Sequence, residues 1–180
     1  MNNNLTFETA VRVVLFNSKD EILLQGIRIP NKPQFFITPG GRVEEKEDLC
    51  DAVMRELVEE TGFSDFVLIS ERPLFSGYHT MHRLHSQGSH RQVRLLEHFF
   101  AARLVGNQDC LDKNRQQLTS EERSVFTGQK WFALSDLNPS EIIFVPINVK
   151  EFAEAILYGR DIPEVDFRDP PQFNHANKLM

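Results

Sequence analysis

Hydrophobic positions in the first third of the chain change from strand-like to helix-like spacing. Residues 7–17 are rich in β-branched side chains and predict a strand, and residues 21–26 predict a second strand that returns from a turn. A short strand is expected at 35–37. Between 48 and 61 the apolar side chains recur at helical intervals, and Gly62 is placed to end that helix.

The rest of the chain alternates apolar stretches with long polar segments. Residues 106–129 predict a loop, with a short helix starting near Thr119. The proline-rich residues 161–180 predict a tail after a single domain over residues 1–160. Further strands are expected at 66–69, 93–104 and 130–134, and an amphipathic helix at 149–158. This order of elements predicts an α/β protein in which helices cover a mixed sheet.

Composition narrows the class of protein. The 180 residues are 41% hydrophobic and 26% charged, which is typical of one globular domain. A net charge of −6 argues against a basic surface for nucleic-acid polymers, and no apolar run is long enough to predict a membrane span. Cys50 and Cys110 are too few for a disulfide framework, and the N-terminus lacks a secretion-signal pattern, so a cytoplasmic location is expected. The apolar strands and the tail leave room for a homodimer.

Three acids on the predicted helix carry the most informative chemistry in the sequence. Glu56, Glu59 and Glu60 are spaced i, i+3, i+4, which places their carboxylates on one helix face. They continue the apolar stripe, so a helix that packs on the protein would carry them inward. Buried carboxylates repel one another unless positive charge is present, and oxygen ligands suit Mg²⁺ or Mn²⁺ better than Zn²⁺. The alternative interpretation is a solvated acidic face without a ligand.

The turn before this helix offers main-chain groups to the same site. Gly40 and Gly41 permit backbone conformations that other residues resist, and they let a ligand approach closely. A carbonyl oxygen of this turn can act as a further ligand for a hard cation. Arg55, on the helix, can pair with Glu47 and hold the loop against it.

Residues 41–63 resemble the signature of the Nudix hydrolases, the MutT-like family. That signature is glycine, five residues, glutamate, seven residues, Arg-Glu, an aliphatic residue, any residue, Glu-Glu, any residue, glycine and an aliphatic or aromatic residue. So many fixed choices at fixed spacing make a specific signal, and only the last position departs from the common form, with phenylalanine. The matching residues are Gly41, Glu47, Arg55, Glu56, Leu57, Glu59, Glu60, Gly62 and Phe63.

The resemblance implies an α/β/α sandwich around a mixed β-sheet, Mg²⁺ or Mn²⁺ as cofactor, and hydrolysis of a pyrophosphate linkage in a nucleoside diphosphate derivative. The catalytic, metal-binding carboxylates that it implies are Glu56, Glu59 and Glu60, joined by the carbonyl of Gly41 or Gly40. The signature segment, residues 41–63, is called the box below. The residues that the resemblance implies for bracing the box are Glu47 and Arg55, with Gly62 at the helix end.

One more acid outside the box often serves such enzymes as a base or ligand. The sequence offers Glu97 in the predicted central strand, and Glu121 and Glu122 in the segment before Trp131. The residue pattern leaves the three open, and Glu122 is carried forward as the catalytic candidate.

Arginines outside the box are candidates for substrate contact. Arg12 lies mid-strand among valines, where an unpaired charge is costly to bury, so it faces the site or meets an acid such as Glu8. Arg28 follows the second strand, and the backbone of Gly40 borders the same site.

Residues 78–91 form a histidine-rich segment with two arginines, interpreted as a substrate loop or as a solvated polar loop. Tyr78, at its start, is a candidate for substrate binding because some dinucleoside-polyphosphate hydrolases of the family carry a tyrosine near this distance from the box. Phe36 and Trp131 can stack on a base but are more typical of a core.

The main hypothesis is therefore a divalent-metal-dependent Nudix hydrolase of a small nucleotide, such as a nucleoside triphosphate or dinucleoside polyphosphate. One alternative is a Nudix-like domain that senses a nucleotide without turnover, although such domains usually lose box acids and none is lost here. Another is an ADP-sugar pyrophosphatase, which the lack of a proline near Tyr78 disfavours.

Overall fold

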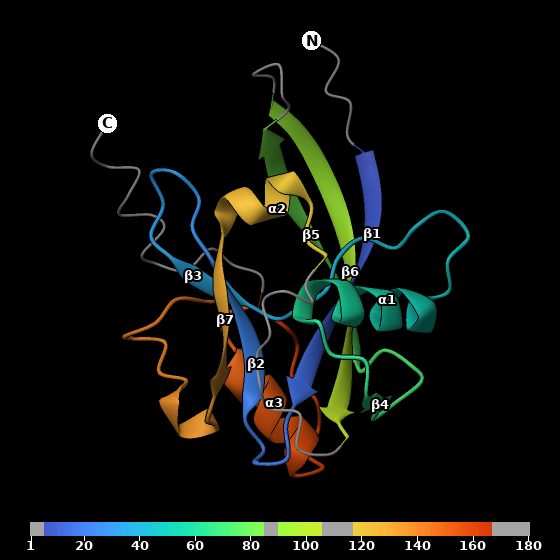
Figure 1. Cartoon of the computed structure of the whole chain (residues 1–180), viewed down its shortest axis with the longest axis vertical. Helices are drawn as coiled ribbons and strands as arrows, with labels where there is room; N and C mark the ends of the chain where they lie inside the picture. The colour runs from blue at the N-terminus through green and yellow to red at the C-terminus, as the bar shows by residue number, and fades with distance from the viewer. Residues whose placement is uncertain (1–5, 85–89, 106–116, 167–180) are drawn as a thin grey trace.

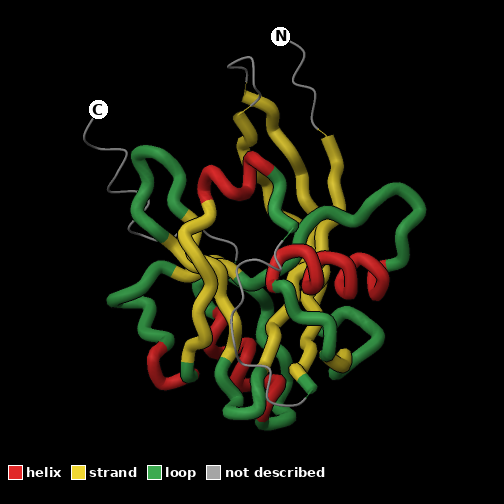
Figure 2. Tube along the Cα trace, viewed as in Figure 1, coloured by secondary structure: helices red, strands yellow, loops and turns green. Residues whose placement is uncertain are grey.

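A computed structural model describes residues 6–84, 90–105 and 117–166 of the chain (Figure 1). Its strands gather into one sheet, and Figure 2 shows the helices outside it. The strands are β1 (Thr6–Phe16), β2 (Ile22–Ile27), β3 (Phe35–Ile37), β4 (Phe66–Leu68), β5 (Phe75–Leu84), β6 (His90–Leu104), β7 (Phe126–Phe132) and β8 (Phe144–Val145). The helices are α1 (Leu49–Thr61), α2 (Ser120–Val125), α3 (Val149–Leu157) and a short 3₁₀ helix, η2 (Leu134–Asp136).

The sheet mixes parallel and antiparallel pairs in the order β4-β6-β1-β2-β3-β8, with β5 also beside β6 and β7 also beside β2. β1 runs parallel to β6 over its whole length. By contrast, β1 and β2 share a single partner position, Phe16 with Ile22, next to the turn that joins them. β2 instead pairs with β3 and β7, so β1 and β2 diverge away from the turn.

The residues that follow β3 run along the edge of β1 that β2 leaves. The main-chain nitrogens of Val11 and Val13 donate to the carbonyls of Gly41 and Pro39, both at 2.9 Å. This pairing fixes the two-glycine turn against the sheet.

α1 packs its apolar stripe on one face of the sheet. It begins after Asp48, whose side chain accepts a hydrogen bond from the Cys50 nitrogen, and it ends at Gly62, where φ is 77°. The cluster on this face includes Val11, Val13, Ala52, Val53, Leu57 and Phe100. The predicted helix, its end at Gly62 and its apolar stripe are all present.

α3 covers the opposite face of the sheet. Its Phe152 meets Phe99 of β6 edge to face, with the ring centroids 5.6 Å apart. Ile162 and Val165, which lie in the segment predicted as a tail, pack against the same core cluster. The packed part of the chain therefore extends past residue 160. With α1 and α3 on its two faces, the mixed sheet is the α/β sandwich that the sequence predicted.

The polar segments are where the sequence-based predictions fail. The loop predicted over 78–91 is wrong for the residues described, because 78–84 belong to β5 and 90–91 to β6, which pair antiparallel. Antiparallel strands can leave one face to solvent and need few apolar residues there. The loop predicted up to residue 129 is likewise wrong from Phe126 onward, where β7 begins. β8 was not predicted, since two residues carry no periodicity.

One further sequence-based prediction is confirmed, and several concern residues that the structure does not describe. The helix start predicted near Thr119 is confirmed, since Thr119 caps α2. No helix in residues 6–84, 90–105 or 117–166 has the length and apolar character needed to span a membrane. Residues 85–89, 106–116 and 167–180, which include Cys110 and most of the predicted tail, lie outside the described residues.

Candidate active site

The turn between β3 and α1 carries glycine at two positions where a Cβ would meet other atoms of the protein. Gly40 has a φ of 136°, and a Cβ on it would collide with the carbonyl oxygen of Val11. A Cβ on Gly41 would lie 2.5 Å from a carboxylate oxygen of Glu56. The backbone of the turn is therefore in close contact with the acids of α1.

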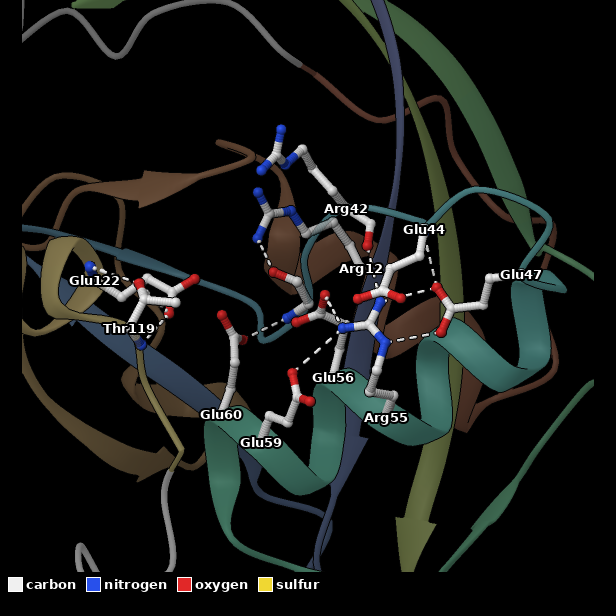
Figure 3. Close-up of polar contacts among 11 residues, drawn as sticks. Arg12, Arg42, Glu44, Glu47, Arg55, Glu56, Glu59, Glu60, Thr119 and Glu122 are labelled. Carbon is white, nitrogen blue, oxygen red and sulfur yellow. Dashed lines mark hydrogen bonds and ion pairs between the residues drawn. The ribbon is translucent and has the colours of Figure 1, made fainter. Parts of the chain in front are cut away.

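α1 directs three acids toward this turn, as Figure 3 shows. Glu56 and Glu60 are buried, with 7% and 8% of their surface exposed, whereas the Glu59 side chain is 39% exposed. The two buried acids follow the apolar stripe inward, as the spacing predicted for all three, whereas Glu59 lies at the edge of the stripe and is partly exposed.

Arg55 lies between these acids and the loop that precedes α1 (Figure 3). Its Nε and Nη2 donate to the two oxygens of Glu47 at 2.8 and 2.9 Å. Its Nη1 donates to Glu56 at 2.8 Å and to Glu59 at 3.3 Å. The hydrogen bonds from Arg55 lower the pKa of Glu47, and this two-point contact is the geometry that a bracing pair requires.

Arg12 reaches the same turn from β1. Its Nη1 donates to the carbonyl of Gly40 at 2.8 Å, and its Nε donates to Glu97 at 2.8 Å. The Gly40 nitrogen in turn donates to Glu60 at 2.7 Å. The turn is thus held by an arginine on one side and by a box acid on the other.

Burial raises the pKa of two of the three box acids, Glu56 and Glu60. Loss of solvation raises the pKa of Glu60 to about 7, against the opposing effects of the Gly40 amide and Arg12. Loss of solvation also raises the pKa of Glu56, and Arg55 opposes that shift. These carboxylates therefore lie where additional positive charge would stabilise their ionised forms.

The donor chemistry of this cluster fits a hard divalent cation, since it offers three carboxylates beside a backbone turn. In the arrangement described, however, no three acidic, histidine or cysteine side chains within the described ranges converge into a ready metal site. Protein donors hold the oxygens instead: Arg55 holds Glu56 and Glu59, and the Gly40 nitrogen holds Glu60. A bound cation would compete with Arg55 for two of the acids.

The acids line a cavity of about 1380 Å³, which is large enough for a nucleotide. Part of its wall is charged and part is apolar. The charged lining is three arginines and several glutamates, namely Arg12, Arg42, Arg55, Glu8, Glu44, Glu45, Glu56, Glu59, Glu60, Glu121 and Glu122. The apolar lining includes Ile27 of β2, Ile37 of β3, and Leu118, Val125 and Phe126 around α2, and it is completed by Phe7 and Val43.

The α2 region carries Glu121 and Glu122 to the same cavity. One oxygen of Glu122 accepts hydrogen bonds from the nitrogen and the hydroxyl of Thr119, both at 2.8 Å, in a capping box. Glu122 also contributes to the raised pKa of Glu60, so the two carboxylates lie within electrostatic reach. Glu97, the third candidate acid, is not among the residues that line the cavity.

Two predicted substrate residues lie apart from this cluster. Tyr78 is exposed on β5, where the guanidinium of Arg94 lies 5.3 Å from its ring centroid. Arg28 donates to Gln34 at 2.8 Å. Neither is among the cavity-lining residues. Phe36 and Trp131 pack in the core clusters, as is typical of their residue types.

Sequence reasoning missed Arg42. Arg12 faces the cavity, which was one of its two predicted alternatives, but the acid that it meets is Glu97 and not Glu8, the example offered. Glu8, the suggested partner, lies 3.9 Å from Arg42 instead. The true partner, Glu97, is 85 positions away from Arg12 and lies on the neighbouring parallel strand, opposite Ala10. No local pattern carries that register.

Comparisons with known proteins agree with the geometry. The family model of the NUDIX domain matches residues 6–151. The chain is 28% identical over 160 residues to a protein of Pelagibacter ubique named RNA pyrophosphohydrolase, across 86% of this chain and 96% of that one. It is 29% identical over 147 residues to Nudix hydrolase 25 of Arabidopsis thaliana, across 78% and 77% of the two chains.

Solved structures show the same fold. A NUDIX hydrolase from Nitrosomonas europaea superposes with a TM-score of 0.56 at 20% identity, covering 87% of this chain and 92% of that one. A MutT protein from Methanosarcina mazei gives a TM-score of 0.53 at 19% identity, covering 87% and 96%. Because the family model spans most of its length, the chain belongs to the Nudix hydrolase family and is a pyrophosphohydrolase of that family.

Proposed function

We propose that this protein uses a divalent cation, Mg²⁺ or Mn²⁺, to hydrolyse a pyrophosphate linkage in a nucleoside diphosphate derivative. The observation that carries the proposal is the placement of Glu56, Glu59 and Glu60 on the side of α1 that faces the two-glycine turn, at the wall of a nucleotide-sized cavity. An acidic protein needs positive charge beside a polyphosphate, and a cation held by these acids would supply it.

The three box acids would hold the cation, with the carbonyl of Gly41 as a further ligand. When bound, the cation neutralises phosphate oxygens and stabilises the charge that develops on the transferred phosphorus. The Gly41 carbonyl already accepts one hydrogen bond from Val11, which leaves its second lone pair for this role.

The remaining roles belong to side chains around the cavity. Water attacks phosphorus, the bridging P–O bond breaks, and the proton of the water passes to a carboxylate that acts as general base. Glu122 is proposed for that base because it lines the cavity and lies within electrostatic reach of Glu60. Arg12 is proposed to bind a phosphate oxygen, because it lines the same wall.

The substrate class follows from the cavity as a whole. The charged wall suits the phosphates, and the apolar wall that includes Ile27, Ile37 and Phe126 suits a base or another planar group. A small nucleotide, such as a nucleoside triphosphate or a dinucleoside polyphosphate, is the substrate that we propose. Tyr78 and Arg28, away from this cavity, would act only on a longer ligand.

A second candidate substrate is the 5′-triphosphate end of an RNA. The observation that favours it is the similarity to the Pelagibacter ubique protein, which is named RNA pyrophosphohydrolase and is covered over 96% of its length. Only the end of such a polymer would enter the cavity, so this substrate does not require a basic surface.

The test is a panel of substrates assayed with Mg²⁺, with Mn²⁺ and with a chelator. It should contain nucleoside triphosphates, dinucleoside polyphosphates, ADP-sugars and a 5′-triphosphorylated RNA. Cleavage at a P–O–P bridge that stops with chelator supports the proposal, and preference for one member names the class. Nucleotide binding without cleavage under either metal would favour a non-catalytic sensing domain instead. Preferred cleavage of ADP-sugars would identify the protein as an ADP-sugar pyrophosphatase.

A matched pair of variants ties the activity to the box. Glu59→Gln combined with Glu60→Gln removes two of the proposed ligands and should abolish cleavage. Glu154→Gln removes a carboxylate on α3 that pairs only with Arg160 in the described structure, and it should leave cleavage unchanged. Equal activity in the wild type and in the double box variant would overturn the proposal. Light scattering on the same samples tests the predicted homodimer.

A further inference from the structure

Glu97 is a buried acid that the cavity does not use directly. It lies in the middle of β6 with 4% of its surface exposed, and it is not among the cavity-lining residues. One of its oxygens accepts a hydrogen bond from Arg12 Nε at 2.8 Å. Its other oxygen lies 3.4 Å from Nε2 of His79 on β5. Both oxygens therefore face nitrogen atoms of basic residues within the sheet, one through a hydrogen bond and the other through a looser contact.

A carboxylate so deeply buried is costly unless a cation pairs with it. Arg12 is that cation, and it lies between Glu97 and the cavity, with 23% of its side chain exposed. The guanidinium is planar, so a bond at Nε and a second bond at Nη1 fix its orientation completely. Nη1 makes that second bond to the carbonyl of Gly40.

The third guanidinium nitrogen, Nη2, has no hydrogen-bond partner among the residues that the structure describes. It belongs to a side chain that lines the cavity beside Glu56 and Glu60. A fixed guanidinium with a free N–H edge in a polyphosphate site is suited to bind a phosphate oxygen, because Arg makes strong charge-assisted bonds of this kind.

We propose that Glu97 is a positioning residue that orients Arg12 for binding a substrate phosphate, and that His79 supports it from β5. This inference rests on the proposed function of the cavity and deepens it. Glu97 acts through Arg12 and takes no proton from the attacking water. The same contacts continue through Gly40 to Glu60, so the arginine also fixes the turn on which a box acid rests.

A thermodynamic cycle on the two residues separates this role from direct catalysis. Glu97→Gln keeps the shape of the side chain and removes its charge, and Arg12→Gln removes the guanidinium without leaving a large void. Each single variant should raise KM by about tenfold or more, because one charge-assisted bond is lost or loosened. The double variant should be no worse than Arg12→Gln alone, since Glu97 has nothing left to orient.

A binding measurement makes the test independent of turnover. Calorimetry with imidodiphosphate, which resists hydrolysis, should give the same pattern of weakened binding in the two single variants and no further loss in the double variant. If the wild type binds imidodiphosphate but cleaves nothing, the proposed reaction fails while the pairing of Glu97 with Arg12 is still tested. Asp20→Asn is the matched control, because it removes the exposed carboxylate that pairs with Arg103 of β6, and it should leave binding unchanged.

Three results would overturn the inference. Losses from Glu97→Gln and Arg12→Gln that multiply in the double variant would mean that Glu97 acts on its own. A fall in kcat at unchanged KM in Glu97→Gln would make it part of the chemistry. A lower melting temperature with unchanged KM and unchanged imidodiphosphate affinity would leave it a purely structural residue. If Glu97→Gln does not fold, Glu97→Asp, which retains the charge at a shorter reach, is measured in the same cycle and judged by the same outcomes.

Discussion

Glu60 and Gly40 are joined by a hydrogen bond of 2.7 Å from the glycine nitrogen to the carboxylate, although twenty positions separate them in sequence. The bond links the helix that carries the acids to the turn that faces them. On its far side the same glycine accepts a hydrogen bond from Arg12. Gly40 thus couples the helix that carries the acids to the central strand β1 through the two peptide groups that flank its Cα.

The two glycines of the turn should respond differently to alanine. Gly40→Ala adds a Cβ that meets the backbone of Val11 at a positive φ, so it should lower the free energy of unfolding by about 1–3 kcal/mol or more. Gly41→Ala adds a Cβ against the carboxylate of Glu56, which can move. It should keep the protein folded and lower kcat by about tenfold or more by displacing that acid.

Urea unfolding and steady-state kinetics on both glycine variants check this prediction. A stable Gly40→Ala protein with normal unfolding would contradict the backbone contact. A Gly41→Ala protein with wild-type kcat would mean that the position of Glu56 does not matter.

The pair of Glu47 with Arg55 should make stability depend on pH. Arg55 lowers the pKa of Glu47 below its ordinary value of 4.5 in the folded protein. The stabilisation is therefore fully present above pH 4.5 and is lost as the pH falls through the lowered folded value. Glu47→Gln should cost about 1.5–3 kcal/mol at neutral pH, and its difference from the wild type should shrink in acid.

Chemical unfolding at several pH values measures that difference. The exposed neighbour Glu45, changed to glutamine, serves as the control and should leave the unfolding curve unchanged at every pH. A Glu47→Gln deficit that stays constant into acid would refute the linkage to this carboxylate.

Glu122 and its neighbour Glu121 should differ sharply if the base is assigned correctly. Glu122→Gln removes a base while keeping a side chain that can complete the capping box with Thr119, so α2 should persist. We expect kcat to fall by about a hundredfold or more. Glu121→Gln should leave kcat within a factor of about two.

A pH–rate profile of the two variants is the corresponding measurement. Loss of one limb of the profile in Glu122→Gln, with the limb retained in Glu121→Gln, is the expected result. An equal effect of the two changes would mean that neither acid is the base.

Much of the site could be read from local sequence, because its geometry is local. The acids Glu56, Glu59 and Glu60 share a face through helical periodicity alone, and the apolar stripe they extend predicts which way they point. The stop at Gly62 follows from residue type in the same way. Fixed spacing within one helix and one turn needs no tertiary information.

What escaped prediction depends on strand register. The pairing of Arg12 with Glu97 arises from the parallel alignment of β1 and β6, and the sequence pointed instead to the nearby Glu8. The polar strand β5 escapes prediction because its pairing with β6, rather than an apolar pattern, makes it a strand. Pairing between distant strands is a tertiary choice that overrides local propensity.

Calorimetric titration with Mn²⁺ tests the central claim most directly, because it measures the cation site without any substrate. The protein should bind Mn²⁺, and affinity should fall by at least about tenfold when Glu59→Gln and Glu60→Gln are combined, because two oxygen ligands are lost. Glu154→Gln, on the opposite face, should bind as the wild type does. Wild-type affinity for Mn²⁺ in the double variant would contradict the account.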